Sequence, residues 1–424
     1  MARKSQFPLS VNPGIPKEQK IPKSWKLAQF GEVLRVVERP AQLRDEDEYQ
    51  LVTAKRNREG IIPREKLLGK KILTKNQYYL KSGDFLISRR QIVHGACGVV
   101  PESLDGAIVS NEYATLLPTN DILLQYLSYY SHTTHFQQTC FHSSIGIDIE
   151  KMVFKIEDWL HHKMPFPPIS EQQKICAILN SIDNAIQTTQ DVIDQTRRVK
   201  HGLQQQLLKH GIGHTQFKET ELGKIPKEWS VVSISDLGEV VTGSTPSTNK
   251  SEYWGGDIPF VTPSDISDAP YVTKVQRSVT SLGASKGRII PSGSVLITCI
   301  ASIGKNALVN RDCLTNQQIN SIICNELCDS VFLYNSMDFS SKKLSQMAGI
   351  TAVPIVNKSQ FSKIQLALPS FKEQQNIASI LSFHDEFIQV EKEKLNKFIL
   401  IKKCLLQALL TGRVRVKLNE EIVV

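Results

Sequence analysis

The sequence predicts a mixed α/β (α+β) chain in which two compact domains alternate with two long helices. Three observations carry this prediction. Signature motifs repeat about 200 residues apart, each copy ends in a proline-free stretch with helical periodicity, and the segments between these stretches contain β-branched runs and turns. The length of 424 residues exceeds what one ordinary core holds, so more than one domain is expected.

The repeat marks duplicated halves. The tripeptide EQQ stands at 171–173 and again at 373–375, an offset of 202, and at that offset residues 171–208 match at 14 of 38 positions without a gap. A stretch that tolerates no insertion indicates one regular element. A second signature opens each half, IPKSW at 21–25 and IPKEW at 225–229.

The gap-free stretches are predicted helices. Their apolar residues recur at about 3.5-residue spacing, which is typical of a coiled-coil seam. The residues expected to pack in the seam are Ile175, Ile178, Ile182, Ile186, Ile193, Leu203 and Leu207 in the first copy, and Ile377, Ile380, Ile388, Leu395, Phe398, Leu405 and Leu409 in the second. The alternative is a long amphipathic helix that packs only on its own domain.

The ends of both helices carry recognisable signals. Ser170 and Ser370 are placed as N-caps, and Gly211 and Gly412 stand where helix-ending glycines belong. The expected division is therefore a domain at 1–168, a helix at 169–212, a domain at 213–369, and a helix with its tail at 370–424.

Three polar residues interrupt the second apolar stripe: His384, Glu391 and Lys402. They could set the register of the helices, contact another protein, or lie at the solvated edge of an imperfect seam.

Composition restricts the class of protein. A net charge of +9 fits a polyanionic partner such as nucleic acid, and it also fits many other soluble proteins. No apolar run reaches the ~20 residues that span a bilayer, and no apolar segment follows the basic residues near the N-terminus. The eight cysteines form no CxxC pair. These features predict a cytoplasmic chain without a membrane partner.

The two domains share a layout. SGDFLIS at 82–88 and SGSVLIT at 292–298 each read as a turn followed by a buried strand. Glycine-containing loops follow, and Asn111 and Asn316 then stand near a further strand. A shared layout with divergent detail predicts one fold with two specificities.

Several motifs resemble those of the specificity subunits of Type I restriction-modification systems. They are TELGKIPKEW at 220–229, GSTPS at 243–247, WGGDIPFVTPSDI at 254–266 and PFPPISEQQKI at 165–175. The first half departs from GSTPS and WGGDIPF and carries SRRQIVHGACGVVPESLDGAIVSNE at 88–112, which looks like another subclass of the same domain. The resemblance covers nearly the whole chain.

This resemblance implies two target recognition domains, two long antiparallel helices that form a coiled coil, and an internal pseudo-two-fold. It implies a DNA-recognition subunit that binds an asymmetric bipartite site on double-stranded DNA, one half per domain. The implied partners are two modification subunits, which bind S-adenosylmethionine, and two restriction subunits, which use ATP and Mg²⁺. No cofactor is expected on this chain.

Candidate DNA contacts are basic, amide and hydroxyl side chains in loops, because arginine and lysine suit guanine edges or phosphates and amides suit adenine. In the first domain they are Lys55, Arg56, Asn57, Arg58, Arg89, Arg90, Gln91 and His94. In the second they are Ser244, Thr245, Ser247, Lys250, Tyr253, Ser302 and Lys305. For Asn316 and Gln317 a role in bracing the fold is favoured over DNA contact.

No catalytic or metal site is predicted. The chain contains no amino-methyltransfer NPPY-type motif, no phosphate loop and no paired nuclease acids. His132, His135, Cys140 and His142 cluster in sequence but fit no zinc spacing. The alternatives are the specificity subunit of a related system with fused nuclease-methyltransferase partners, an orphan methylation-only specificity subunit, a self-contained enzyme, and a coiled-coil adaptor.

Overall fold

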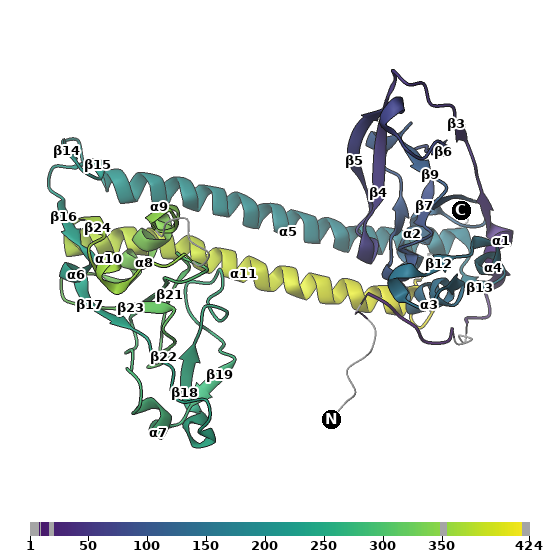
Figure 1. The fold of residues 1–424 in the computed structure, drawn as a ribbon. Helices are drawn as coiled ribbons and strands as arrows, with labels where there is room; N and C mark the ends of the chain where they lie inside the picture. The colour runs from purple at the N-terminus through teal and green to yellow at the C-terminus, as the bar shows by residue number, and fades with distance from the viewer. Residues whose placement is uncertain (1–7, 9, 17–20, 348–353, 418–424) are drawn as a thin grey trace, which may run out of the picture. The chain divides into compact units, whose positions relative to one another are not determined.

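The computed structural model describes residues 8, 10–16, 21–347 and 354–417. The first N-terminal residues, which bear on the expectation of no signal segment, and the end of the tail at 418–424 lie outside this range. The chain divides into two compact units, Met1–Gln187 with Asn396–Val424, and Thr188–Leu395. Figure 1 traces the helices and strands of each unit.

The first unit holds a mixed domain built of short elements. Its strands are β1 Lys26–Gln29, β2 Leu34–Val36, β3 Pro40–Ala41, β4 Glu48–Ala54, β5 Ile61–Leu68, β6 Gln77–Tyr79, β7 Phe85–Ser88, β8 Cys97–Val99, β9 Ile108–Ser110, β10 Tyr113–Pro118, β11 Ser144–Ile145, β12 Val153–Phe154 and β13 Lys163–Phe166. Its helices are α1 Phe30–Val33, α2 Leu124–Tyr130, α3 Thr134–His142 and α4 Ile156–Leu160. The larger sheets have the orders β2-β10-β7-β8 and β3-β6-β9-β4-β5.

The second unit repeats part of this plan. Its strands are β14 Phe217–Thr220, β15 Gly223–Pro226, β16 Ser230–Ser233, β17 Gly238–Thr242, β18 Trp254–Val261, β19 Arg277–Val279, β20 Val295–Thr298, β21 Asn306–Leu308, β22 Leu314–Thr315, β23 Ile319–Cys324 and β24 Gln365–Leu368. Its helices are α6 Ile234–Leu237, α7 Ser281–Ala284, α8 Ser330–Phe339, α9 Ser341–Met347 and α10 Lys358–Ser362. The larger sheets have the orders β17-β23-β20-β21 and β19-β18-β22.

The four-stranded sheet is common to both units. Strands β7 and β20 are buried along their whole length, and each pairs antiparallel with its two neighbours in the same order. Each follows a turn whose glycine, Gly83 or Gly293, has φ of 85°. These are the two strands predicted from SGDFLIS and SGSVLIT, so the prediction of a turn before a buried strand is confirmed.

The long helices are α5 Ile169–His210 and α11 Phe371–Leu409. Gly211 and Gly412 follow them with φ of 67° and 69°, the left-handed conformation that ends a helix at little cost in glycine. Ser370 caps α11 through its hydroxyl, which accepts from the Glu373 amide. Ser170, in contrast, lies inside α5, so its prediction as an N-cap was wrong.

The two helices run antiparallel within each unit. In the first unit, Asp183 of α5 pairs with Lys402 of α11, and residues nearer the start of α5 pack against Leu406, Leu409 and Leu410. In the second unit, Lys200 pairs with Asp385, and Leu207 and Leu208 pack with Ile377 and Leu381. In both units, increasing numbers on one helix meet decreasing numbers on the other. The mixed α/β fold with two long antiparallel helices is thus confirmed.

Each unit takes segments from both long helices, so its boundary cuts across α5 and α11. This differs from the expected division into successive domains and helices. Antiparallel pairing explains the difference, because the end of one helix completes the core around the start of the other.

The buried stripe of each helix differs from the expected one at a single equivalent position. Ile178 and Ile380 are 38% and 37% exposed, whereas their neighbours Leu179 and Leu381 are fully buried. At about 100° per residue, positions three and four after Ile175 lie on opposite sides of it, and the partner helix covers the side of Leu179. Ile178 and Ile380 were therefore wrong as seam residues. Ile175, Ile193, Leu207, Ile377, Ile388 and Leu409 are buried, and Ile182, Ile186, Leu203, Leu395, Phe398 and Leu405 are half-buried.

The EQQ motif attaches each domain to its helix. Glu171 accepts a hydrogen bond from Trp25 Nε1 at 3.2 Å, and Glu373 accepts one from Trp229 Nε1 at 3.0 Å. The two tryptophans are those of the IPxxW motifs. The two repeated signatures are therefore in contact in each unit. Each carboxylate also binds a basic side chain from the segment that follows the other long helix. Arg415 lies 2.7 Å from Glu171, and His214 lies 2.9 Å from Glu373.

The first glutamine of EQQ connects the helix start to the neighbouring loop. Gln172 donates to the carbonyls of Asp121 and Pro167 and accepts from the Leu123 amide. Gln374 makes the same three bonds, with Leu327, Pro369 and Asp329. Gln173 and Gln375 are exposed. Two of the three letters of the motif thus have a structural explanation.

Candidate nucleic-acid interface

In the first domain, the two predicted basic clusters converge. Arg56 lies in the turn after β4 and donates through Nε to Gln91 Oε1 at 2.9 Å, which joins residues 55–58 to residues 89–91. The connection arises because Arg58 donates its backbone N–H to the carbonyl of Gly95. Asn57 and Arg58 both have positive φ, near 60°, so the turn is tightly constrained.

Most of these cations already have anionic or carbonyl partners. Arg56 forms an ion pair with Glu150 at 2.7 Å, and Arg90 forms one with Glu112 at 2.7 Å. Lys55 lies 3.7 Å from Glu59. Because these pairs are about half exposed, they add little stability, and the cations can exchange a carboxylate for a phosphate at small cost.

Three of the candidate residues in the first domain are integrated in the structure. Arg58 donates to the Ser131 carbonyl at 2.8 Å, and its burial lowers its pKa. His94 is fully buried, with Nδ1 3.0 Å from the Ser10 hydroxyl and Nε2 3.2 Å from Glu150. His94 therefore has no atom exposed at the surface of the domain. Arg89 is half-buried beside β12, because its carbonyl accepts from the Phe154 amide.

In the second domain, the GSTPS loop packs against residues 315–318. The Ser244 amide donates to the Thr315 carbonyl, and the Thr245 hydroxyl donates to Gln317 Oε1 at 2.8 Å. A Cβ at Gly243 would stand 2.2 Å from Thr315 Oγ1 and 2.3 Å from the Asn316 carbonyl, so only glycine allows this approach. The loop is therefore held in one conformation.

The residues that follow this loop extend the same surface. The Ser247 carbonyl accepts from Trp254 Nε1 at 3.1 Å, and Lys250 lies over the Tyr253 ring at 5.3 Å. Tyr253 itself is 7% exposed. Asn316 and Gln317 make internal hydrogen bonds, Asn316 with Gln318 and Gln317 with Thr245, consistent with the bracing role that the sequence favours.

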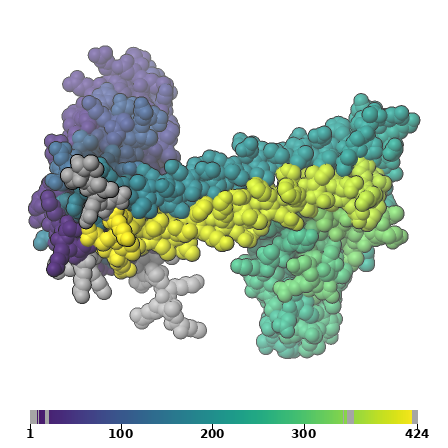
Figure 2. Space-filling model, turned by 180° about the vertical axis from the view of Figure 1, so that it is seen from behind, coloured from purple at the N-terminus to yellow at the C-terminus, as the bar shows by residue number. Residues whose placement is uncertain are grey.

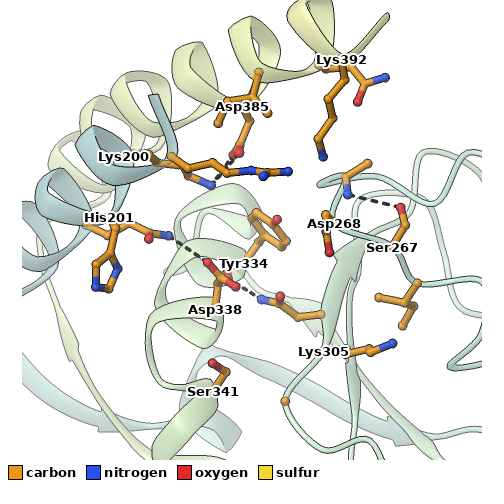
Figure 3. Close-up of a pocket in the computed structure, with 18 of the residues that line it drawn as sticks. Lys200, His201, Ser267, Asp268, Lys305, Tyr334, Asp338, Ser341, Asp385 and Lys392 are labelled. Carbon is orange, nitrogen blue, oxygen red and sulfur yellow. Dashed lines mark hydrogen bonds and ion pairs between the residues drawn. The ribbon is translucent and has the colours of Figure 1, made fainter. Parts of the chain in front are cut away.

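Ser302 and Lys305 lie in the loop between β20 and β21. The Ser302 carbonyl accepts from the Thr298 hydroxyl, and Lys305 lines a cleft of about 930 Å³ between the domain and the helix segments of the same unit. Figure 3 shows Lys305 and Lys392 from opposite walls of this cleft, with Asp268 between them. The structure does not join this pair of residues to the GSTPS surface through any hydrogen bond of the described residues.

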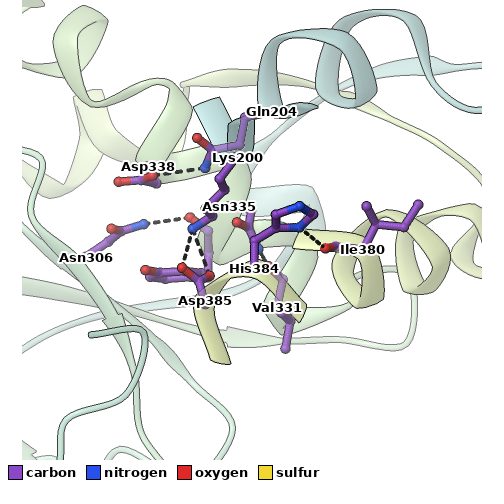
Figure 4. Close-up of polar contacts among 10 residues, drawn as sticks. Lys200, Gln204, Asn306, Val331, Asn335, Asp338, Ile380, His384 and Asp385 are labelled. Carbon is purple, nitrogen blue, oxygen red and sulfur yellow. Dashed lines mark hydrogen bonds and ion pairs between the residues drawn. The ribbon is translucent and has the colours of Figure 1, made fainter. Parts of the chain in front are cut away.

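The deep wall of the cleft is an ordered polar network. Lys200 pairs with Asp385, Gln204 donates to Asp338, and Asn306 donates to the Tyr334 carbonyl (Figure 4). Burial raises the pKa of Asp385, and the adjacent Lys200 ammonium opposes that rise. The network fixes the helix pair against the domain within the second unit.

The sequence cluster His132, His135, Cys140 and His142 is divided among separate contacts. His135 Nδ1 lies 2.9 Å from the Tyr130 hydroxyl, and His142 reaches the Gly14 carbonyl. Burial lowers the pKa of both His132 and His135 to about 4. Across the described part of the chain, no group of three or more histidine, cysteine or acidic side chains is placed to hold a metal ion.

Among the described residues, no helix has the length and apolar character that crossing a membrane requires. The outer face of α11 nevertheless carries exposed apolar side chains. In the second unit Ile380, Phe383, Phe387 and Val390 form one stripe at steps of three, four and three, and Phe383 is 66% exposed. Figure 2 shows that the part of α11 in the second unit lies at the surface of that unit.

Comparison with known proteins shows which family has this architecture. The family described as the Type I restriction modification DNA specificity domain matches twice, at residues 22–196 and 226–398, which together cover most of the chain. The MjaIX specificity subunit of Methanocaldococcus jannaschii is 39% identical over 188 residues, or 42% of this chain and 43% of that protein. The MjaVIII specificity subunit of the same organism is 24% identical over 423 residues, covering 94% of this chain and 95% of that protein.

Two solved structures share the fold. One chain, from work on complex assembly and conformational transition of the type I R-M system, aligns with a TM-score of 0.62 at 16% identity, over 94% of this chain and all of that chain. The S subunit of a Type I restriction-modification system from M. genitalium aligns with a TM-score of 0.58 at 13% identity, over 96% of this chain and all of that one.

Coverage of the curated relatives is uneven. The chain spans 43%, 60% and 33% of the lengths of the MjaIX, MjaX and Haemophilus influenzae HindI specificity subunits. The double match to the specificity domain and the repeated domain-and-helix plan nevertheless agree. The chain belongs to the family of Type I restriction-modification DNA specificity proteins.

Proposed function

We propose that this chain is the DNA-recognition subunit of a Type I restriction-modification complex and that it binds an asymmetric bipartite site, with one half-site per domain. The observation that carries the proposal is the combination of a shared four-stranded sheet with different second sheets. The first domain has a five-stranded sheet and the Arg56–Gln91 surface, whereas the second has a three-stranded sheet and the GSTPS surface. Two domains that share the four-stranded sheet but differ in their loops are suited to bind two half-sites of different sequence.

The chain recognises DNA in this proposal, and other subunits act on it. Two modification subunits would bring S-adenosylmethionine, and two restriction subunits would bring ATP and Mg²⁺. The assembly would work in the cytoplasm, on chromosomal or incoming double-stranded DNA. The antiparallel helices would set the distance between the half-sites, because the span of a helix grows by about 1.5 Å per residue.

The exposed stripe on α11 is the proposed docking face for a modification subunit. At the equivalent positions, 202 residues earlier, α5 carries Ser181, Ala185 and Thr188 beside Ile178, so the aromatic stripe is specific to α11. An apolar stripe of this kind on a soluble helix is typical of a protein interface. Its regular spacing fits an amphipathic helix of the partner. One structural neighbour comes from work on complex assembly of the type I R-M system, which supports the proposal that this chain also assembles with other subunits.

The test is methylation mapping. The full-length chain and its modification subunit are expressed together in a host without other adenine methylation, and methylated adenines are mapped across the genome. The expected result is one bipartite motif with unlike halves and a fixed spacer. Methylation at continuous, single-part sites, or methylation that does not need this chain, would overturn the proposal.

A further inference from the structure

A β-bulge in the second domain folds the Trp254 ring back over its own sheet. Strand β18 pairs antiparallel with β19, and both Trp254 and Ile258 stand opposite Val279, so the intervening residues bulge out. Gly255 has φ of 84°, a conformation that favours glycine. A Cβ at Gly256 would lie 2.5 Å from the Val279 carbonyl oxygen. The two glycines of WGGDIPF are therefore the physical requirement for this bulge.

The bulge creates a platform for Arg277. The Arg277 guanidinium carbon lies 3.6 Å from the centroid of the Trp254 ring, which is the distance of a stacked pair. Phe260, directly opposite Arg277 on β18, is buried and meets the indole edge-on at 5.1 Å. The indole N–H donates to the Ser247 carbonyl at 3.1 Å. The ring is thus fixed by a buried aromatic residue and by the GSTPS loop.

The Arg277 side chain is exposed and its donors are uncommitted. Within the described residues, its guanidinium has no hydrogen bond and no carboxylate oxygen within 4.0 Å. This contrasts with Arg56 and Arg90 of the first domain, each of which has a carboxylate at 2.7 Å. A guanidinium that lies flat on a ring keeps its N–H edge free, and its orientation is already restricted before a ligand arrives.

We propose that Arg277 reads a guanine in the half-site bound by the second domain, with Trp254 as its positioning residue. The inference rests on the proposed function. A guanidinium fork matches the O6 and N7 acceptors of guanine in the major groove, and such a bidentate contact needs a fixed plane. A phosphate contact needs only a point charge, and the exposed Lys250 beside Tyr253 offers one on the same surface.

The experiment uses the full-length chain with its modification subunit, S-adenosylmethionine and a duplex DNA library randomised at both half-sites. Wild-type complex is expected to require guanine at one position of the second half-site. Arg277→Ala should lose about ten- to one-hundred-fold discrimination at that position only, since one bidentate contact carries ~1–3 kcal/mol. Arg277→Lys should fail to restore it. The first half-site should be read as in the wild type, which shows that the variant is folded.

Variants of Trp254 test its role as the positioning residue. Trp254→Phe keeps a ring beneath the guanidinium and should retain most of the discrimination, whereas Trp254→Ala should lose part of it while Arg277 is still present. An unchanged second half-motif in Arg277→Ala would overturn the inference. So would uniformly weaker methylation that Arg277→Lys restores, because that pattern belongs to a phosphate contact. A wild-type complex without any bipartite motif would instead contradict the proposed function itself.

Discussion

Lys200 Nζ lies 2.6 Å from Asp385 Oδ1, and the residues at the equivalent positions of the repeat, Lys402 and Asp183, form the same pair at 2.6 Å. The repeat therefore extends from apolar residues to an ion pair that crosses between α5 and α11 in each unit. Of the polar residues that interrupt the apolar stripe of α11, Lys402 therefore contributes to helix pairing. Glu391 pairs with Lys394 on its own helix, and His384 donates to the Ile380 carbonyl one turn back.

The two ion pairs should differ in their effect on stability because they differ in burial. The Lys200 and Asp385 side chains are 11% and 13% exposed, whereas those of Lys402 and Asp183 are 27% and 34% exposed. Lys200→Ala leaves a buried carboxylate without its partner and should lower the free energy of unfolding by roughly 3–5 kcal/mol. Lys402→Ala should cost about 1 kcal/mol or less. Urea unfolding of the full chain measures both, and equal effects would contradict the burial argument.

The EQQ motif supplies a matched pair of variants. Gln172→Leu removes the donor to two carbonyls and the acceptor of one amide at a fully buried position, and should cost ~2–4 kcal/mol. Gln173→Leu alters an exposed neighbour of the same type and should change stability by less than ~0.5 kcal/mol. Thermal melting separates the two cases. A Gln173 effect as large as that of Gln172 would show that the third letter of the motif has a structural role after all.

Stability of the first unit should depend on pH between about 6.5 and 4. His132 and His135 have pKa values lowered to about 4 by burial, below the ordinary 6.5, so the unfolded chain binds more protons in this window. Stability is then complete above pH 6.5 and is lost as pH falls, on the order of 1–3 kcal/mol for each histidine. Unfolding free energies of wild type and His135→Gln across this range provide the measurement, and the variant should show the shallower slope. Identical slopes would contradict the assignment to His135.

Charge on the outer face of α11 should prevent assembly without unfolding the chain. Phe383→Asp and Phe387→Asp introduce carboxylates into the proposed docking stripe and should weaken binding of the modification subunit by at least tenfold, since each removes an exposed aromatic contact. Asn396→Asp adds the same charge to an exposed position nine residues, or about two and a half turns, from Phe387, on the opposite side of α11, and is the control.

Sedimentation of the chain with its modification subunit reports the outcome. The control should assemble as the wild type does. Normal assembly of both aspartate variants would exclude this stripe as the docking face, provided their melting temperatures match that of the control.

The helices could be predicted because their signals are local. Spacing of apolar residues, Gly211 and Gly412 at the ends, and the unbroken repeat are all read within one segment. The sequence could not show that Leu179, and not Ile178, lies in the seam. Both residues are apolar, and only the direction of the partner helix distinguishes them. The composition of each unit is also non-local, since it depends on which helix ends meet.

The same distinction between local and non-local features applies to the candidate interface. Residue types in loops indicated Arg56, Arg90 and the GSTPS surface, but not the acidic partners, which the fold brings from up to 94 residues away, as with Glu150. Whether these residues touch DNA stays a prediction. Arg277 could not be predicted as a DNA contact from the sequence, because its stacking partner Trp254 lies across a bulged strand pair. The available signal was the two adjacent glycines directly after Trp254.

Each unit contains segments of both long helices, and this has a consequence for synthesis on the ribosome. Residues 188–395 emerge as one continuous segment, and this segment makes up the second unit. The first core lacks Leu406, Leu409 and Leu410 until the last part of the chain has been made, and Glu171 waits equally long for Arg415. The second unit can therefore complete its core at an earlier stage of synthesis than the first. A prematurely terminated chain leaves its first core open, which exposes it to proteolysis before it can compete for partners.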